Sequence, residues 1–215
     1  YKRQVQLSPD TRLEGWDGCG GYHFSDSIIY GFSHTHLSGT GISDYADVLL
    51  MPTTGKIHLT NGVNEAKIND APINEQGYAS RFSHENEIAK AGYYQVLLDD
   101  YNINVELTSS IRAGVHRYTY PKNEDANVIL DLKHRDKLLD YKINIIDSQT
   151  ITGFRHSTEW ARDQRIYFTL KFSVPFLNPI TNGAELNEEH EGFNNEKNVL
   201  ALSFGKISEP LELSL

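Results

Sequence analysis

The stretch Ile103-Asn104-Val105-Glu106-Leu107-Thr108 alternates strictly between apolar and polar side chains. Ile111 continues the apolar face after a short interruption. A period of two is typical of a strand that packs one face on a core and leaves the other in water. Residues 103–112 therefore predict a half-buried antiparallel strand.

The same pattern recurs along the chain, most clearly at 166–172, where Ile166, Phe168, Leu170 and Phe172 share one face. We predict further strands at 27–32, 46–51, 56–60, 92–99, 114–120, 126–132, 141–147, 149–155, 198–204 and 210–215. About a dozen short strands with little helix predict an all-β fold, a large antiparallel β-sandwich. No linker or repeat divides residues 1–215, so we expect one domain.

Two segments depart from the strand pattern. A short helix is expected from His84 to Lys90, with Ser83 as its capping residue and Glu87 three residues beyond the first helical position. The acidic stretch 178–198 is predicted to be a solvated loop.

Composition excludes several classes of partner. The chain has 20 Lys and Arg against 29 Asp and Glu, a net charge of −9, and no basic stripe. This charge repels phosphate backbones, so nucleic acid is not expected as a partner. No apolar run reaches the length of a membrane span, and Cys19 is the sole cysteine, so no intrachain disulfide forms.

The run from Gly15 to Gly41 concentrates glycines, histidines, hydroxyls and a tryptophan on a backbone with little apolar pattern. Trp16, flanked by glycine, could present a flat apolar face to the C–H groups of a sugar ring. Asp17 beside it could accept hydrogen bonds from sugar hydroxyls. The alternative is a tryptophan that packs under its own loop.

His34 and His36 lie two residues apart, so in an extended chain both imidazoles fall on one face. They could bind one ligand, or a metal with further donors from His23 or from His84 and Glu85. This spacing is not specific. Hydrogen bonding to substrate or to neighbouring loops remains open beside a purely structural pair, and we assign no metal ligand.

Other motifs do not predict catalysis. Glu85 and Glu87 lie too close on one segment to straddle a glycosidic bond. The triplet His134-Arg135-Asp136 lacks the companion motifs of a protein kinase. Trp160 is either an aromatic lid over one end of the core or a ligand contact. We therefore name no catalytic residue in this chain.

Several motifs occur together in one order along the chain. They are Gly15-Trp16-Asp17, Gly31-Phe32-Ser33-His34-Thr35-His36-Leu37-Ser38-Gly39-Thr40-Gly41, Asp47-Val48-Leu49-Leu50-Met51-Pro52, Phe82-Ser83-His84-Glu85-Asn86-Glu87, His116-Arg117-Tyr118 and Trp160-Ala161-Arg162-Asp163-Gln164. Over nearly its whole length the chain resembles the N-terminal domain of family 92 of the glycoside hydrolases. These are calcium-dependent α-mannosidases found largely in Bacteroidetes.

The resemblance implies a galactose-mutarotase-like sandwich joined to a helical toroid domain that follows it and is absent here. It implies an inverting exo-α-mannosidase, often α-1,2-specific, that acts on N-glycans or mannan, in the periplasm or at the outer surface. The acid, the base and most calcium ligands belong to the helical domain, so this chain is expected to be inactive alone. The substrate-binding candidates carried over are Trp16, Asp17, His34 and His36.

The chain also departs from the family pattern. Gly18 and Gly20 replace larger or polar residues, Ala46 stands where we expect glycine, and 156–159 differs, so linkage preference is open. Two other hypotheses stand beside the enzyme. One is a self-sufficient, non-catalytic carbohydrate-binding module, and the other is a cupin-like metal enzyme that uses His34 and His36.

Overall fold

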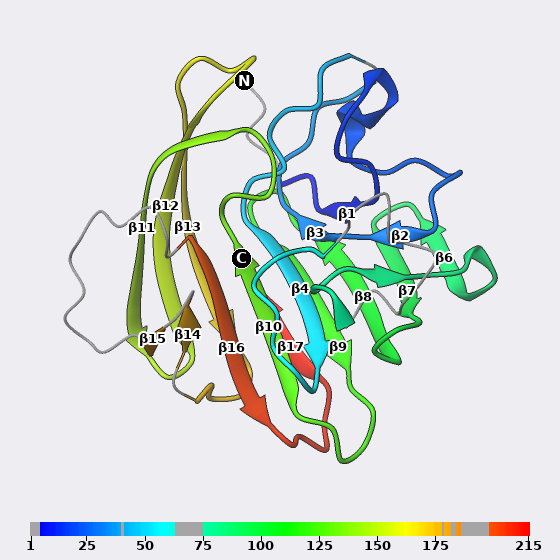
Figure 1. Ribbon diagram of the computed structural model, residues 1–215, viewed down its shortest axis with the longest axis vertical. Coiled ribbons are helices and arrows are strands. Elements are labelled where there is room, and N and C mark those ends of the chain that lie inside the picture. Colours follow the sequence, from blue (N-terminus) through cyan, green and yellow to red (C-terminus); the bar gives the residue numbers. More distant parts are fainter. Residues whose placement is uncertain (1–4, 40, 63–74, 178, 182–183, 186–197) are drawn as a thin grey trace.

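The computed structural model describes residues 5–39, 41–62, 75–177, 179–181, 184–185 and 198–215. Two large sheets stack face to face, and every strand pair in them is antiparallel (Figure 1). The prediction of an all-β antiparallel sandwich is therefore confirmed.

The first sheet has the strand order β1-β3-β4-β10-β16-β14-β15. Its strands are β1 (Ser8–Asp10), β3 (Gly31–Ser33), β4 (Leu49–Thr54), β10 (Ala126–Asp131), β16 (Val199–Gly205), β14 (Ile180–Thr181) and β15 (Ala184–Glu185). A two-stranded sheet pairs β2 (Ile28–Ile29) with β5 (Ser80–Arg81).

The second sheet has the order β11-β12-β13-β17-β9-β8-β7-β6. Its strands are β11 (Lys137–Asp147), β12 (Thr150–Thr158), β13 (Gln164–Phe172), β17 (Leu211–Ser214), β9 (Gly114–Thr119), β8 (Ile103–Ser109), β7 (Tyr93–Leu98) and β6 (Glu87–Lys90). Long β11 and β12 form one side of the molecule in Figure 1.

The core lies between these sheets and follows the alternation of the sequence. In β8 the side chains of Ile103, Val105 and Leu107 are buried, and β9, β13 and β17 also bury every second residue. By contrast, β4 and β10 are buried on both faces. Their near-continuous apolar runs are typical of strands without a solvent face.

Three local predictions are wrong. Residues 56–60 form bends and irregular backbone instead of a strand. Strand β8 ends at Ser109, so Ile111 lies in the following turn with 66% of its surface exposed. At 84–90 only one 3₁₀ turn forms, η3 (His84–Asn86), and the chain then enters β6 because Glu87–Lys90 pairs with β7.

The capping role of Ser83 is confirmed, since its hydroxyl accepts a hydrogen bond from the Glu85 N–H. Of the predicted loop at 178–198, the described part contains β14 and β15, and residues 178, 182–183 and 186–197 lie outside the described residues. The described residues contain no helix that is long and apolar enough to cross a membrane.

Candidate functional site

A short 3₁₀ turn, η1 (Trp16–Gly20), presents the tryptophan predicted from the sequence. It lies at the upper end of the molecule in Figure 1, as does the tip of the β12–β13 hairpin. Within the turn, Gly18 and Cys19 are buried, whereas 70% of the Trp16 surface is exposed. The alternative that Trp16 packs under its own loop is therefore not what the fold adopts.

Asp17 follows on the same turn, and 57% of its side chain is exposed. Its carboxylate lies 4.0 Å from Nη1 of Arg12. Arg12 lies closer to Asp26, since Nη2 of Arg12 donates to Oδ1 of Asp26 at 2.5 Å. Asp17 thus keeps acceptor oxygens available to a ligand at the surface.

The turn is anchored from below by Arg135, whose side chain is only 4% exposed. Its Nη1 donates to the carbonyl of Gly18 at 3.1 Å and its Nη2 to that of Arg12 at 2.5 Å. These bonds satisfy carbonyls of the η1 loop that would otherwise lack donors. Trp16 therefore stands on a fixed backbone.

Asp10 is the buried centre of this anchor. Its Oδ1 lies 2.9 Å from Nε2 of His36 and 3.6 Å from Nη2 of Arg135, and its Oδ2 lies 3.4 Å from Nε2 of His134. Burial alone raises a carboxyl pKa, but His36 and His134 hold the pKa of Asp10 well below its usual range. A side chain on Gly21 would collide with Asp10 at 2.4 Å, which explains that glycine.

His34 and His36 are both buried, with 3% and 4% of their surfaces exposed. His36 contacts the Gln6 carbonyl through Nδ1 at 2.7 Å, and Asp10 and Ser33 through Nε2 at 2.9 Å. Protein groups thus occupy the ring nitrogens that a sugar or metal would need. This placement favours hydrogen bonding to the neighbouring loops over hydrogen bonding to a substrate.

His34 begins a hydrogen-bond relay between the sheets. Its Nδ1–H donates to the Val48 carbonyl at 2.7 Å, so Nε2 is the acceptor for Nε2–H of His116 at 2.9 Å. The Tyr118 hydroxyl then donates to Nδ1 of His116 at 2.7 Å. Both imidazoles are neutral in this arrangement, with the tautomers assigned from their partners.

Burial lowers the pKa of His34 to about 4. Burial and the nearby His34 also hold the pKa of His116 well below its usual value. A proton added at Nε2 of His34 would place two N–H groups against each other, and one added at Nδ1 of His116 would oppose the hydroxyl hydrogen that Tyr118 donates. The relay is therefore consistent only with the neutral pair.

The segment that follows His36 is strained. Tyr45, Ala46 and Val48 have φ values of 69°, 53° and 56°. Such angles favour glycine, and a β-branched residue rarely adopts them. The expectation of glycine at Ala46 agrees with this backbone, and here an alanine bears the strain.

The strained segment directs carboxylates toward the β12–β13 hairpin. Asp47 pairs with Arg155 and accepts 2.6 Å hydrogen bonds from Thr35 Oγ1 and Gln164 Nε2. Arg155 is 1% exposed, also pairs with Asp136, and donates from Nε to the Leu132 carbonyl at 2.6 Å. Burial alone would lower its pKa, but Asp47 and Asp136 raise it.

Asp44 joins the same region, since its Oδ2 accepts from the Ala161 N–H at 3.0 Å. This bond attaches the tip of the β12–β13 hairpin, where Trp160 is 69% exposed, to the loop before β4. Burial, followed by the charges of Asp44, Asp47 and Asp136, raises the pKa of Tyr45. One end of the sandwich therefore gathers exposed aromatic groups above buried charges.

An open pocket of about 510 Å³ lies beside Trp16, between three loops. Its lining comes from residues 13–15, 41–43 and 134–136. The Gly41 N–H donates to the Trp16 carbonyl at 2.9 Å, which ties the second loop to η1. The volume lies in the range of small-ligand sites.

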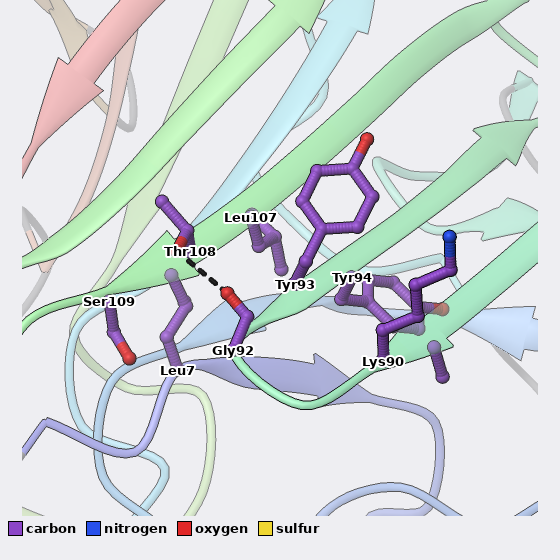
Figure 2. Close-up of a pocket in the computed structure, with 9 residues that line it drawn as sticks. Leu7, Lys90, Gly92, Tyr93, Tyr94, Leu107, Thr108 and Ser109 are labelled. Carbon is purple, nitrogen blue, oxygen red and sulfur yellow. Dashed lines mark hydrogen bonds between the residues drawn. The ribbon is translucent and has the colours of Figure 1, made fainter.

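A smaller pocket of about 230 Å³ lies where the ends of β6, β7 and β8 meet (Figure 2). Thr108 Oγ1 donates there to the Gly92 carbonyl at 2.7 Å. None of the site residues predicted from the sequence lines this pocket. We therefore place the candidate site at the Trp16 pocket.

The described residues contain neither a paired catalytic carboxylate at Glu85 and Glu87 nor a metal cluster. Glu87 is occupied by His84, Tyr22 and Tyr94, whose polar atoms lie 2.5 to 3.1 Å from its oxygens. In the same described part of the chain, no group of three or more His, Cys, Asp or Glu side chains is arranged to hold a metal ion. We assign no calcium ligand here.

Sequence reasoning missed the buried supports of the site: Asp10, Asp47, His116, Arg135, Arg155. Part of the signal was available, because His134-Arg135-Asp136 and His116-Arg117-Tyr118 place charged or imidazole groups next to apolar strands. Such groups are buried only when they are paired. Their decisive partners, however, are distant in sequence: His34 lies 82 residues from His116, and Arg12 lies 123 residues from Arg135.

The fold defines a two-sheet antiparallel β-sandwich domain, which presents an exposed tryptophan beside an open pocket. Residues 4–214 match the family model described as the glycosyl hydrolase family 92 N-terminal domain. The chain therefore belongs to this family, as the resemblance predicted.

Solved structures agree with the family model. The chain is similar to a family GH92 alpha-mannosidase from Bacteroides thetaiotaomicron, with 31% identity, a TM-score of 0.81 and coverage of 98% of this chain and 29% of that chain. A family GH92 inverting mannosidase from B. thetaiotaomicron VPI-5482 has 22% identity, a TM-score of 0.74 and coverage of 99% and 27%, a likeness that concerns the fold.

Among curated proteins, the chain is similar to an "uncharacterized secreted glycosidase" from Arthroderma benhamiae. The two are 26% identical over 112 residues, which are 52% of this chain and 13% of that protein. The chain thus spans less than a third of the length of these relatives.

Proposed function

We propose that this chain is the N-terminal, substrate-cleft domain of a calcium-dependent, inverting exo-α-mannosidase. Its substrate is a mannose-containing glycan, with α-1,2-linked mannose of N-glycans or mannan as the preferred unit. Membership of family 92 and the likeness to a GH92 alpha-mannosidase support this substrate class.

In this proposal the reacting groups come from a C-terminal helical domain of the same protein. Inversion needs an acid and a base on opposite faces of the sugar, far enough apart to admit a water molecule. The described residues offer no such pair at Glu85 and Glu87, since Glu87 is held by three neighbours. Calcium would likewise be held mainly by that second domain, and this chain alone would be inactive.

The observation that carries the proposal is the exposure of Trp16 on an anchored turn beside an open pocket. Its indole would stack on the leaving-group sugar, and Asp17 would accept hydroxyl hydrogen bonds. Covering ~50–80 Å² of ring surface at ~25 cal/mol per Å² contributes about 1–2 kcal/mol. His34 and His36 would order the loops from within the fold.

The test is Trp16→Ala in the intact protein that contains residues 1–215. We expect kcat/KM for an α-mannobioside to fall about 5- to 30-fold, the equivalent of the lost stacking energy. Trp16→Phe should retain part of the activity. Tyr167→Ala removes an equally exposed aromatic side chain from β13 and should leave kcat/KM unchanged. An unaltered kcat/KM in Trp16→Ala would contradict the assigned contact.

The location that fits this activity is the periplasm or the outer surface. The curated relative is named as a secreted glycosidase, which supports export of this protein as well. Cell fractionation with an antibody against the chain tests this assignment, and a purely cytoplasmic signal would contradict it.

A further inference from the structure

The pocket beside Trp16 has a polar floor whose hydrogen-bonding capacity the chain does not use. Among the described residues, Asp136 Oδ2, Arg135 Nε and His134 Nδ1 are buried without a hydrogen-bond partner, while Nε2 of His134 faces Asp10 Oδ2 at 3.4 Å. All three residues line the pocket. Buried polar groups are normally paired, so a cluster of unpaired ones requires an explanation.

Asp136 in the pocket lining belongs to a group of buried charges that continues behind the pocket. Arg155 is shared between Asp47 and Asp136, so one guanidinium faces two carboxylates. Asp44 Oδ1 is a further buried oxygen without a partner in the described part of the chain. A hydrogen-bond donor in the pocket would therefore be stabilised.

The rim leaves room for such a donor. Gly15 and Gly41 both line the pocket, and a Cβ built on either glycine meets no atom within 4 Å. Ile42 on the same rim is 47% exposed, and the exposed Glu14 adds a carboxylate. The rim is thus open, with a mixed apolar and acceptor character.

We propose that this pocket is a second sugar subsite, which binds the hydroxyl groups of the glycan unit beyond the one stacked on Trp16. The inference rests on the proposed function and extends it from one subsite to two. Neutral sugar hydroxyls can donate hydrogen bonds to the carboxylates of Asp136 and Glu14. The pocket adjoins the Trp16 backbone through the Gly41 N–H, so one extended glycan can reach both.

A docked protein segment is the rival occupant. Protein interfaces have an apolar, charge-depleted centre. The lining of this pocket instead includes the charged or ionisable side chains of His134, Arg135 and Asp136. The chemistry of the floor favours a polyhydroxylated ligand.

The experiment measures kcat/KM of the intact protein for an α-mannobioside and for the matching mannotrioside, and takes the ratio of trioside to bioside. Ile42→Trp fills the pocket mouth, and Ile146→Trp adds the same bulk at an exposed site on β11. We expect the ratio to fall about tenfold in Ile42→Trp and to stay constant in Ile146→Trp.

Two further variants test the chemistry. Asp136→Asn and Glu14→Gln keep the size of the side chain and remove acceptor charge, and each should lower the same ratio. Because the ratio compares two substrates on one protein, partial unfolding of Asp136→Asn cancels from it.

The outcomes separate the hypotheses. A ratio that Ile42→Trp leaves unchanged would overturn the second subsite. Equal losses on both substrates, with a lower unfolding temperature in Ile42→Trp, would identify a docking contact and also overturn it. If the unmodified protein hydrolyses neither mannoside, the proposed function itself fails, and the subsite falls with it.

Discussion

At the scale of single residues, the buried pair His34 and His116 makes the fold sensitive to acid. Both pKa values are lower in the folded chain than the ordinary value near 6.5, so the unfolded chain binds more protons between about pH 6.5 and 4. Their contribution to stability is complete above pH 6.5 and is lost as the pH falls toward 4. Each group adds a slope of about 1.4 kcal/mol per pH unit within this window.

We therefore predict a fall in the free energy of unfolding from pH 7 to pH 4, measured by urea denaturation at several pH values. His116→Gln retains a donor for His34 and an acceptor for Tyr118 but does not titrate. In this variant the slope of the unfolding free energy against pH should fall by the contribution of about one proton. An unchanged slope in His116→Gln would show that the pair does not titrate as described.

Arg155 is the second residue with a large expected effect. Arg155→Met leaves the carboxylates of Asp47 and Asp136 buried without their cation, and we expect a loss of about 3–5 kcal/mol. Arg165 lies on the adjacent strand with an exposed ion pair to Asp163, so Arg165→Met should cost under about 1 kcal/mol. Similar midpoints of urea unfolding for the two variants would contradict this difference.

The same residues show why sequence reasoning found only part of the site. Trp16 and Asp17 were identified from local composition, because flanking glycines prevent regular burial of the turn. His34 and His36 were named from the same stretch, but the partners that bury them lie elsewhere, at Gln6, Val48 and His116. Spacing along a strand says which side chains share a face, and it does not say whether that face meets solvent.

At the scale of elements, hydrophobic alternation predicted most of the strands. It held in β8, β9, β13 and β17, where one face contacts the core. It was wrong at 56–60, where the pattern was short. The helix expected at 84–90 came from the capping pattern, and there pairing with β7 outweighed it. Sheet order was not predictable, because β10 pairs with β4 and β16, which are distant in sequence.

The central strands also support a stability prediction. Ile129 on β10 is fully buried between β4 and β16. Ile129→Ala should lower the free energy of unfolding by about 2–5 kcal/mol, through lost burial and the cavity that remains. Thr169→Ala on the exposed face of β13 should change it by less than about 0.5 kcal/mol. Chemical denaturation of both variants checks this, and equal values would mean that β10 is not a core strand.

At the scale of the whole molecule, the sandwich carries its two exposed tryptophans and a group of buried charges at one end. The outer surfaces of β9 and β13 are solvated, whereas that end combines Trp16 and Trp160 with the pocket that Gly15 and the buried Asp136 help to line. The solved relatives are more than three times as long as the stretch that this chain matches. Under the proposed function, a cleft shared with another domain would explain why the sandwich presents Trp16 and a pocket without a catalytic pair at Glu85 and Glu87.

The central claim is that this chain supplies one side of a mannoside cleft and that the reactive groups belong to another part of the protein. The most direct test is hydrolysis of an α-mannobioside by the 215-residue chain alone, with calcium present and with folding verified by a cooperative thermal transition. We predict no turnover above the uncatalysed rate, whereas the intact protein hydrolyses the same substrate. Turnover by the isolated chain at a rate ordinary for glycosidases would contradict the claim.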